Sequence, residues 1–324
     1  MDFPTGMEER LITVAIWVVQ LAAVLALPPL VNGIVRKTKA RLQNRIGPPL
    51  FQSYSDLLKL FRKEALVSAN ASWIFPVTPY VVFGTTLLVA ILMPMFSPHP
   101  PLGWMSDFIL LVYLLGLGRF FMALSALDTA SSFGGLGSSR EMTIASLVEP
   151  AMILSIFATA ASAGTMNLNA IASSISPSIT SLLNPSQILA FAGLFIVTLA
   201  ETGRIPVDNP ATHLELTMIH EAMVLEYSGR HLALIKWASQ IKLLIFLSLL
   251  GNLFIPTGIT DSVALVDFLT GIGIFLLKIT GLSLVVALVE STNAKLRLFR
   301  VPDLLMVAFT LSLLSLVLRF LIRS

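Results

Sequence analysis

Eight long apolar runs, separated by polar segments, constrain the fold of this chain more than any other feature of its sequence. An α-helix needs about 20 mainly apolar residues to cross a lipid bilayer, and most of the runs reach that length. They cover residues 11–35, 73–96, 106–127, 141–164, 186–200, 236–256, 264–290 and 302–322. We therefore expect an all-α polytopic membrane protein, a single membrane-embedded domain over residues 1–324 with about eight transmembrane helices plus amphipathic cytoplasmic helices.

The composition agrees with this class and excludes several kinds of site. Hydrophobic residues make up 56% of the chain and charged residues only 12%, whereas a soluble domain carries roughly 25% charged residues. The lack of cysteine excludes disulfides, thiolate zinc sites and cysteine-ligated iron–sulfur clusters. His220 and Glu221 begin like a zinc-protease motif, but Val224 occupies the second ligand position. We expect this chain to bind no metal and no cofactor.

The distribution of Lys and Arg predicts how the chain crosses the membrane. Fifteen of the 21 basic residues fall in segments on one side of the predicted spans, whereas Arg10, Arg319 and Arg323 fall on the other. Because basic loops stay in the cytoplasm, we expect the basic side to be cytoplasmic and both termini to lie outside. The chain is then a multi-pass protein of the cell inner membrane, and topology and lipid, not nucleic acid, explain its net charge of +3.

Residues 201–236, here called the polar island, are the densest group of titratable residues in the chain. We interpret them as a cytoplasmic acidic loop, because they lie between two apolar runs on the basic side. Asn209 and Pro210 predict the start of a short amphipathic helix that ends near Leu225. Carboxylates gathered beside a membrane face indicate proton handling or docking of another subunit. The acidic residues of the island are Glu201, Asp208, Glu215, Glu221 and Glu226.

Residues 36–72 form a second polar segment on the same predicted side. After a break at Gly47, Pro48 and Pro49, apolar and basic residues alternate with helical spacing, which predicts an amphipathic helix on the membrane surface. Two interpretations stay open: an anchor whose basic face meets anionic lipid, or a platform on which a peripheral subunit docks. The docking interpretation assigns the basic residues Arg36, Lys37, Lys39, Arg41, Arg45 and, from the polar island, Arg204.

Several charged residues lie within or at the ends of the apolar runs, where charge is costly and marks functional sites. We expect Arg119, Asp128 and Lys242 to form a buried charge cluster, although Lys242 could instead extend to the interface. Lys278 and Glu290 are proton-path candidates. They are twelve residues apart on one predicted helix, so each must find a partner on another element.

Glu149 is the strongest proton-path candidate by position. Ser139 is a plausible N-cap of the fourth span, which places Glu141 in the first helical turn and makes the glycines at 134, 135 and 137 a hinge. Glu149 follows eight residues later, roughly 12 Å deeper in the bilayer. A carboxylate at that depth must be protonated or paired. Pro150 would free a backbone carbonyl nearby and admit water.

The chain resembles the subunit 1 family of respiratory complex I, in the form found in energy-converting membrane-bound [NiFe] hydrogenases and formate hydrogenlyases. Six motifs in order, on eight predicted spans, carry the resemblance. They are ARLQNRIGPPLFQSYSDLLKLFRKE, ALDTASSFGGLGSSRE, VEPAMIL, ETGRIPVDNPATHLEL with EYSG, KW and ESTNAKLRL. The resemblance covers nearly every loop of the chain.

The resemblance implies a membrane-anchor and coupling subunit that has no catalytic residue of its own. Its partners would be a hydrogenase-like large subunit, an iron–sulfur small subunit and antiporter-like membrane subunits, beside lipid. The Ni–Fe and iron–sulfur clusters would lie in those partners. By position, the family's carboxylate route, which links redox chemistry to proton or sodium translocation, corresponds to Glu141, Glu149, Glu201, Asp208, Glu215, Glu221 and Glu226.

Two alternatives stay open. Within the family, the chain could be the quinone-binding subunit of an NADH:quinone oxidoreductase-like complex, but His213 stands where those members would carry another acid. From another class, it could be a stand-alone secondary ion transporter. The sequence lacks the visible internal repeat that marks many such transporters.

Overall fold

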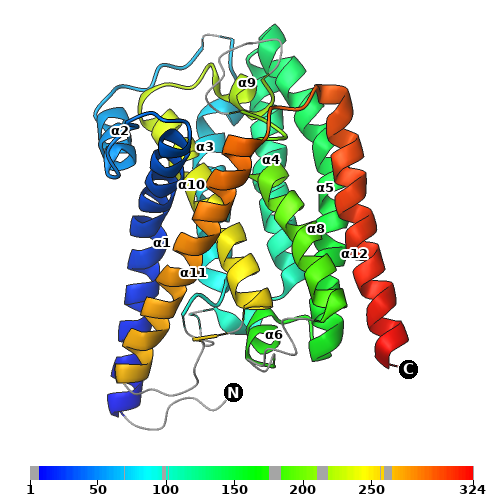
Figure 1. Cartoon of the computed structure of the whole chain (residues 1–324). Helices are drawn as coiled ribbons and strands as arrows, with labels where there is room; N and C mark the ends of the chain where they lie inside the picture. Colours follow the sequence, from blue (N-terminus) through cyan, green and yellow to red (C-terminus); the bar gives the residue numbers. More distant parts are fainter. Residues whose placement is uncertain are drawn as a thin grey trace.

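The computed structural model describes residues 7–68, 70–96, 100, 102–174, 184–209, 218–255, 257–258 and 265–323. These residues form a bundle of α-helices, and they contain no named strand. Figure 1 shows the long helices running side by side along the length of the bundle. In chain order the α-helices are α1 (Met7–Leu42), α2 (Gln52–Phe61), α3 (Ile74–Leu92), α4 (Phe108–Asp128), α5 (Ser132–Ala163), α6 (Leu168–Ser174), α8 (Pro185–Glu201), α9 (His220–Val224), α10 (Gly229–Phe254), α11 (Leu265–Thr292) and α12 (Val301–Arg323).

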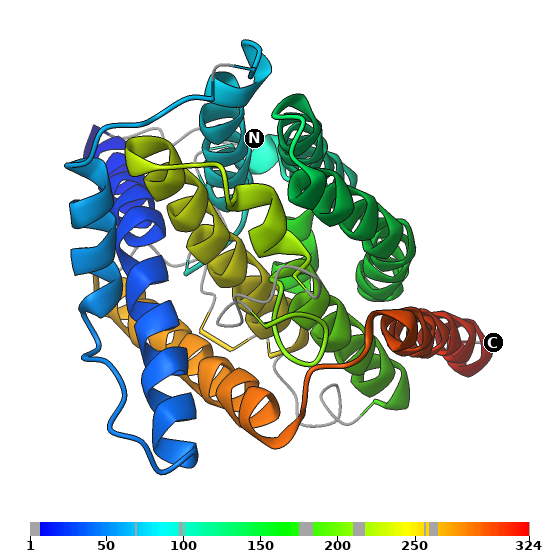
Figure 2. The ribbon, with the colours of Figure 1, turned by 90° about the horizontal axis from the view of Figure 1, so that it is seen from above.

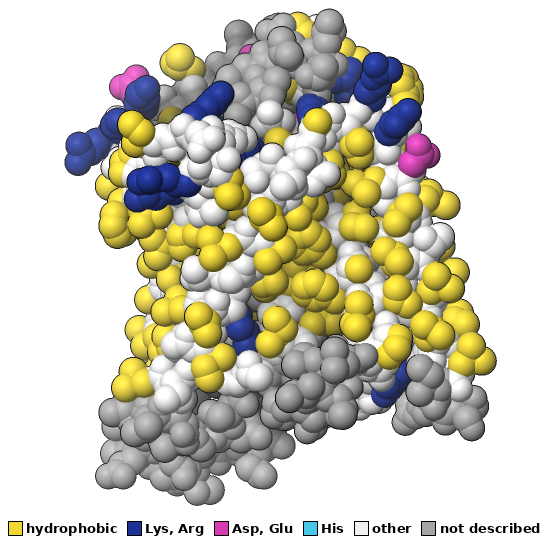
Figure 3. Space-filling view, in the orientation of Figure 1, with side chains coloured by type: hydrophobic (Ala, Val, Ile, Leu, Met, Phe, Trp, Pro, Cys, Tyr) yellow, Lys and Arg dark blue, Asp and Glu magenta, His cyan; other side chains and the backbone are white. Residues whose placement is uncertain are grey.

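The helices match the predicted spans. Within the described residues, seven are long and apolar enough to cross a membrane, and α8 is an apolar helix of 17 residues in the place of the remaining span. The start of α1 and the end of α12 lie at the same end of the bundle, opposite α2 and α9 (Figure 1). Lys and Arg side chains gather at the end with α2 and α9, and a broad apolar belt lies below them (Figure 3). The chain is a multi-pass membrane protein.

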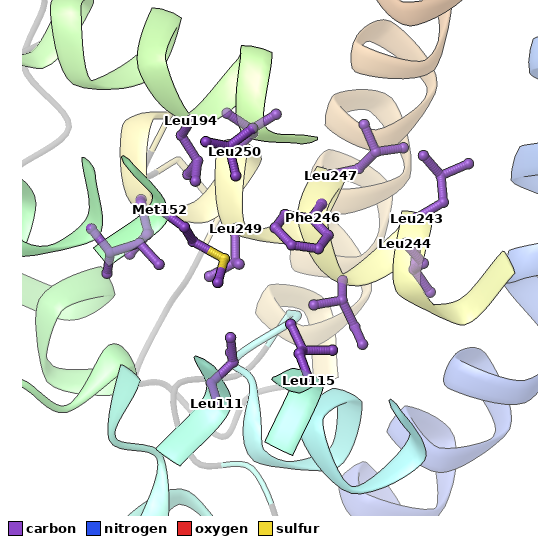
Figure 4. Packing of buried hydrophobic residues seen from close by; sticks show 14 of the residues in the cluster. Leu111, Leu115, Met152, Leu194, Leu243, Leu244, Phe246, Leu247, Leu249 and Leu250 are labelled. Carbon is purple, nitrogen blue, oxygen red and sulfur yellow. The ribbon is translucent and has the colours of Figure 1, made fainter. Parts of the chain in front are cut away.

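Helix α10 forms the centre of the bundle (Figure 2). Every residue from Leu243 to Phe254 is buried, as expected for a helix that is apolar on all sides. It packs against α1, α3, α8 and α11. Figure 4 shows its leucines and Phe246 meeting Leu111 and Leu115 of α4, Met152 of α5 and Leu194 of α8. This apolar core holds the surrounding helices, and with them their polar side chains, in fixed positions.

The hinge and the cap expected in the fourth span are wrong. Helix α5 begins at Ser132 after the N-cap Ser131, so the glycines lie inside the helix and Glu141 is well beyond its first turn. The glycines permit close packing instead of bending. A Cβ at Gly134 would lie 2.4 Å from the carbonyl oxygen of Ala126, and one at Gly137 would lie 2.9 Å from the Cβ of Ala222.

The polar island was predicted to be a loop, but it contains α9 and the first turns of α10. Helix α10 begins at Gly229, seven residues before the predicted start at Lys236. Gly229 has a φ of +51°, and a Cβ there would lie 2.1 Å from the backbone oxygen of Glu64. Only glycine fits this turn, which brings the island against the segment after α2. Of the predicted helix from Pro210 to Leu225, residues 210–217 lie outside the described residues. Met218 and Ile219 are not helical, so the prediction is wrong there, and α9 runs from His220 to Val224.

The amphipathic segment after α1 folds as expected. Helix α2 buries Ser53 and Leu57 and exposes Leu58. The Tyr54 hydroxyl donates a hydrogen bond to the backbone oxygen of Ala26, which ties α2 to α1. Burial raises the pKa of the Tyr54 hydroxyl, so this donor stays protonated at neutral pH. The segment therefore lies along the end of the bundle as a short surface helix.

Candidate functional site

Five charged side chains from four helices meet near the basic end of the bundle. We call this group, made of Arg119, Glu141, Glu149, Glu201 and Lys242, the carboxylate cluster. The guanidinium of Arg119 donates to the carboxylates of Glu149 and Glu201, and its Nε lies 3.9 Å from Glu141. Lys242 Nζ lies 2.6 Å from the second oxygen of Glu201. One arginine therefore joins α4 to α5 and α8, and Glu201 continues the chain of charges to α10.

Local sequence places Arg119 at this junction. Gly118 precedes it, and a Cβ there would lie 2.8 Å from the hydroxyl of Thr85, so α3 and α4 approach closely on one side. On the other side, the carboxylate of Glu149 lies beside Gly116, 3.7 Å from the position of a Cβ, which is an ordinary van der Waals distance. Arginine suits the junction because its planar fork binds two carboxylates at once and stays charged.

Burial differs sharply within the cluster. The side chains of Arg119 and Glu201 are 5% and 2% exposed, whereas that of Glu149 is 39% exposed. Glu149, which was expected to be protonated or paired, is paired with Arg119, and it lies nearer to the surface of the bundle than its sequence position suggests. Lys242 does not extend to the interface: it pairs with Glu201.

A cavity of about 60 Å³ lies beside the cluster. Its charged lining is Arg119, Glu141, Glu201 and Lys242, and its lining also includes Ser239, Thr202 and His220. A cavity needs about 10–15 Å³ and several polar partners to hold a water, so this one has room for water. The cluster counts three carboxylates against two cations, which leaves one negative charge in excess.

A second group of charges holds the segment after α8. Arg204 Nη1 donates to Glu290 Oε1 at 2.6 Å, Lys39 Nζ donates to Glu290 Oε2 at 2.9 Å, and Arg204 Nη2 donates to Asn32 Oδ1 at 3.3 Å. Glu290 thus finds partners on other elements, as predicted. Arg204 is 8% exposed. Its assignment to a docking surface is therefore wrong, because its guanidinium is already bound inside the chain.

A third group fixes the polar island to the loop before α12. Lys295 Nζ donates to Asp208 Oδ1 at 2.6 Å. The backbone N–H groups of Ile219 and His220 both donate to Asp208 Oδ2 at 3.3 Å. Asp208 is buried with these donors. It acts as a clamp that holds the first turn of α9 near α8 and α11.

The other predicted site residues lie apart from the cluster. Asp128 accepts a hydrogen bond from the backbone of Ser72 at 2.7 Å, so its expected place beside Arg119 and Lys242 is wrong. The nine residues that separate it from Arg119 on α4 span about 13 Å. Lys278 Nζ donates to Asn252 Oδ1 at 3.3 Å.

The other described acids of the island, Glu221 and Glu226, are nearer to the surface. Glu221 lies 3.8 Å from Lys236, and Glu226 is exposed. Glu215 and His213 lie outside the described residues. Among the described residues, no group of three His, Asp or Glu could hold a metal ion. The sequence offered no signal for His220 beyond its place on the polar face of a short helix, and its position at the cavity is a finding of the structure.

Comparison with known proteins identifies the family. A family model described as NADH dehydrogenase matches residues 14–320. The chain belongs to the NADH dehydrogenase subunit 1 family. Two relatives from Escherichia coli strain K12 are similar over nearly their whole length. Hydrogenase-4 component C is 35% identical over 91% of this chain and 92% of its own, and formate hydrogenlyase subunit 4 is 34% identical over 92% and 96%.

Other members of the subunit 1 family are more distant. An NADH-quinone oxidoreductase subunit of Syntrophotalea carbinolica is 28% identical over 90% of this chain and 91% of its own. A solved structure of a membrane-bound sulfane sulfur reductase, an archaeal respiratory membrane complex, contains a chain with a TM-score of 0.82 and 20% identity. The match covers 97% of this chain and 100% of that one, and it supports the fold alone.

Proposed function

We propose that this chain is the membrane-anchor and coupling subunit of a multi-subunit energy-converting oxidoreductase of the membrane-bound [NiFe] hydrogenase type. Two of its relatives are named as parts of a hydrogenase and a formate hydrogenlyase. Its partners are a hydrogenase-like large subunit, an iron–sulfur small subunit and antiporter-like membrane subunits. The large and small subunits carry the Ni–Fe and iron–sulfur clusters. This chain carries the carboxylate cluster, which acts as a relay of charge between the redox partners and ion translocation.

The Arg119 junction is the observation that carries the proposal. A guanidinium that binds carboxylates from α5 and α8 couples any change of charge or position on one helix to the other. Glu201 ends α8, and Arg204, three residues later, binds Glu290 and Asn32. A partner that shifts the start of the polar island therefore acts on both charge groups at once. The response is a change of proton affinity within the bundle.

The basic end of the bundle is the proposed docking surface. Arg36 and Arg41 are exposed, and within the described residues the ion-pair contact of Arg36 is a loose one of 3.8 Å with Asp56. Lys37 and Arg45 complete the surface, whereas Lys39 is bound to Glu290 and contributes through that pair. In this proposal the basic end lies on the cytoplasmic side of the inner membrane, and both termini lie on the outer side.

Replacing Glu149 by Gln tests the proposal. The variant keeps the shape of the side chain but cannot hold the negative charge, so the assembled complex should keep its redox activity and lose coupled ion movement. Purified complex in proteoliposomes gives both rates. Glu64→Gln, at an exposed glutamate outside the bundle, is the matched control and should keep both. Full coupled ion movement by assembled Glu149→Gln complex would remove the carboxylate cluster from the mechanism.

Quinone binding is the competing function within the family, and the relatives named as NADH-quinone oxidoreductase subunits favour it. A photoreactive quinone analogue decides between them. Protected labelling of the segment after α1 or of the polar island would support quinone binding, whereas labelling that excess quinone does not displace would exclude it.

A further inference from the structure

His220 lies where the polar island meets the carboxylate cluster, and the relay proposed above does not yet use it. It is half-buried, and it lines the cavity together with Arg119, Glu141, Glu201 and Lys242. Each of these four neighbours makes an ion pair. We propose that His220 takes up protons from the aqueous side and delivers them through this cavity to the cluster, with Glu141 as the first acceptor. This inference rests on the proposed function, since it names the entry residue of the same relay.

The surroundings fix His220 at the edge of the cavity. Its backbone N–H donates to Asp208 Oδ2 at 3.3 Å. Arg140 of α5 donates to the backbone oxygen of Met218, two residues before it, at 3.0 Å. A Cβ added at Gly203 would lie 3.8 Å from the Cβ of His220, which places α9 directly over the end of α8. The backbone around His220 is therefore held beside α5 and beside the segment that follows α8.

Glu141 is the carboxylate best able to accept the proton. Glu201 is bound by Arg119 and by Lys242, and Glu149 is bound directly by Arg119. Among the described residues, the ion-pair contact of Glu141 is the 3.9 Å approach to the Nε of Arg119, and its carboxylate lines the cavity. Water in the cavity can bridge the imidazole and this carboxylate, because the space is large enough to hold it.

The charge balance favours this route. The three carboxylates and two cations of the cluster leave one negative charge, which a protonated imidazole neutralises. In the transfer, one proton leaves the imidazolium and joins the carboxylate of Glu141. The total charge around the cavity stays the same before and after, so the step avoids the cost of creating an isolated charge in a low-dielectric region.

Other charged groups around α9 set when His220 loads. Asp208 lies at its backbone, and Glu221, the next residue, lies 3.8 Å from Lys236. The cavity side presents Arg119, Glu141, Glu201 and Lys242. Imidazole is the side chain whose charge changes over roughly pH 5 to 8. The pH dependence of ion movement should therefore contain a step that belongs to His220.

The test uses the assembled complex in proteoliposomes and two variants, His220→Gln and His220→Ala. Positioned proton-transfer groups contribute about 100-fold or more to a rate, so ion movement per redox turnover should fall at least about tenfold in both. Its step over pH 5 to 8 should disappear. Added imidazole should restore movement in His220→Ala, where the side-chain space is empty. His231→Gln, at a histidine packed on Tyr80 instead of the cavity, should keep the wild-type profile.

Every outcome of this test supports or overturns the role assigned to His220. A wild-type rate and pH profile in the assembled His220→Gln complex would overturn it. A loss of rate in both variants that added imidazole leaves unchanged would also overturn it, because such a loss marks a structural role. Glu149→Gln separates the two proposals. If Glu149→Gln loses coupled movement while His220→Gln keeps it, only the entry residue is wrong. If Glu149→Gln keeps it, the relay itself is wrong.

Discussion

Lys242 and Lys278 are both lysines within membrane-spanning helices, but they have opposite surroundings. Lys242 of α10 lies 2.6 Å from the carboxylate of Glu201. Lys278 of α11 donates to the side-chain amide of Asn252 at 3.3 Å, and it forms no ion pair with a described residue. Asn252 lies ten residues beyond Lys242 on α10, about 15 Å further along the helix. Along α10, a carboxylate thus binds the lysine at the middle of the helix, and an amide near its C-terminal end binds the lysine of α11.

The site around Lys278 presents the dipole of the Asn252 side-chain amide to the lysine. The side-chain nitrogen of Asn252 donates to the backbone oxygens of Pro94 and Met95, at 2.7 and 2.9 Å, so its oxygen points to Lys278. Gln20 of α1 donates to the oxygen of the preceding residue, Met93, at 2.9 Å. These hydrogen bonds satisfy the backbone oxygens of the segment after α3, which would otherwise lack partners. The contrast indicates that charge pairing is concentrated where the relay lies, whereas Lys278 is bound by a neutral amide instead of a carboxylate.

Removing the shared cation should have the largest effect. Arg119→Gln leaves Glu201 buried with one cation and Glu149 with none, and breaking a buried pair costs about 3–5 kcal/mol. We expect a large loss of stability in denaturant unfolding of the purified chain in mixed micelles. Arg36→Gln is the control, since a loose surface pair contributes roughly 0–1 kcal/mol. Equal stability of the two variants would show that the cluster is not held by Arg119.

The two lysines should respond with opposite signs to the same change. Lys242→Met strips Glu201 of a cation and should destabilise the chain by about 2 kcal/mol or more. Lys278→Met removes a charge that costs roughly 2.5–3.5 kcal/mol at mid-membrane and loses one hydrogen bond of about 0.6 kcal/mol, so it should be neutral or stabilising. The same unfolding experiment measures both. A destabilisation of equal size at both sites would contradict the contrast.

The sequence predicted the helices well because bilayer crossing imposes a length and a composition that are visible without any tertiary information. It could not predict which charges meet. Asp128 and Arg119 share a helix yet lie in separate places, whereas Arg119 and Glu201 are 82 residues apart and touch. Such pairing depends on how helices rotate against each other, and no local pattern records that rotation.

The same limit explains the errors in the polar segments. Glycines 134 and 137 were expected to bend the chain, because glycine alone does not say whether it serves a turn or a close contact. Only the neighbouring backbone of Ala126 and the side chain of Ala222 decide that they allow packing. Likewise Arg204 looks like a loop residue in the sequence, and its burial follows from Glu290 and Asn32, which come from α11 and α1.

The smallest expected effect concerns Tyr227, a buried polar side chain that carries no charge at neutral pH. The Tyr227 hydroxyl donates to the backbone oxygen of Phe75 at 2.9 Å, and the two rings stack with centroids 4.0 Å apart. Tyr227→Phe keeps the stacking and loses one hydrogen bond, so it should cost about 1 kcal/mol at neutral pH. Tyr113→Phe, at a side chain that is 72% exposed, should change little.

The pH dependence of this pair has a definite sign. Burial raises the pKa of Tyr227 to about 12, whereas an unfolded tyrosine ionises near pH 10. Between these values the unfolded chain has lost a proton that the folded chain keeps, so the stability that Tyr227 contributes is present below about pH 10 and declines as the pH rises towards 12. The variant lacks this decline, and the stability difference between wild type and Tyr227→Phe should shrink and then reverse at high pH. A difference that stays constant from pH 8 to 12 would show that water reaches the hydroxyl of Tyr227, and that neutral polar groups at this end of the bundle are less well buried than Arg119 and Glu201.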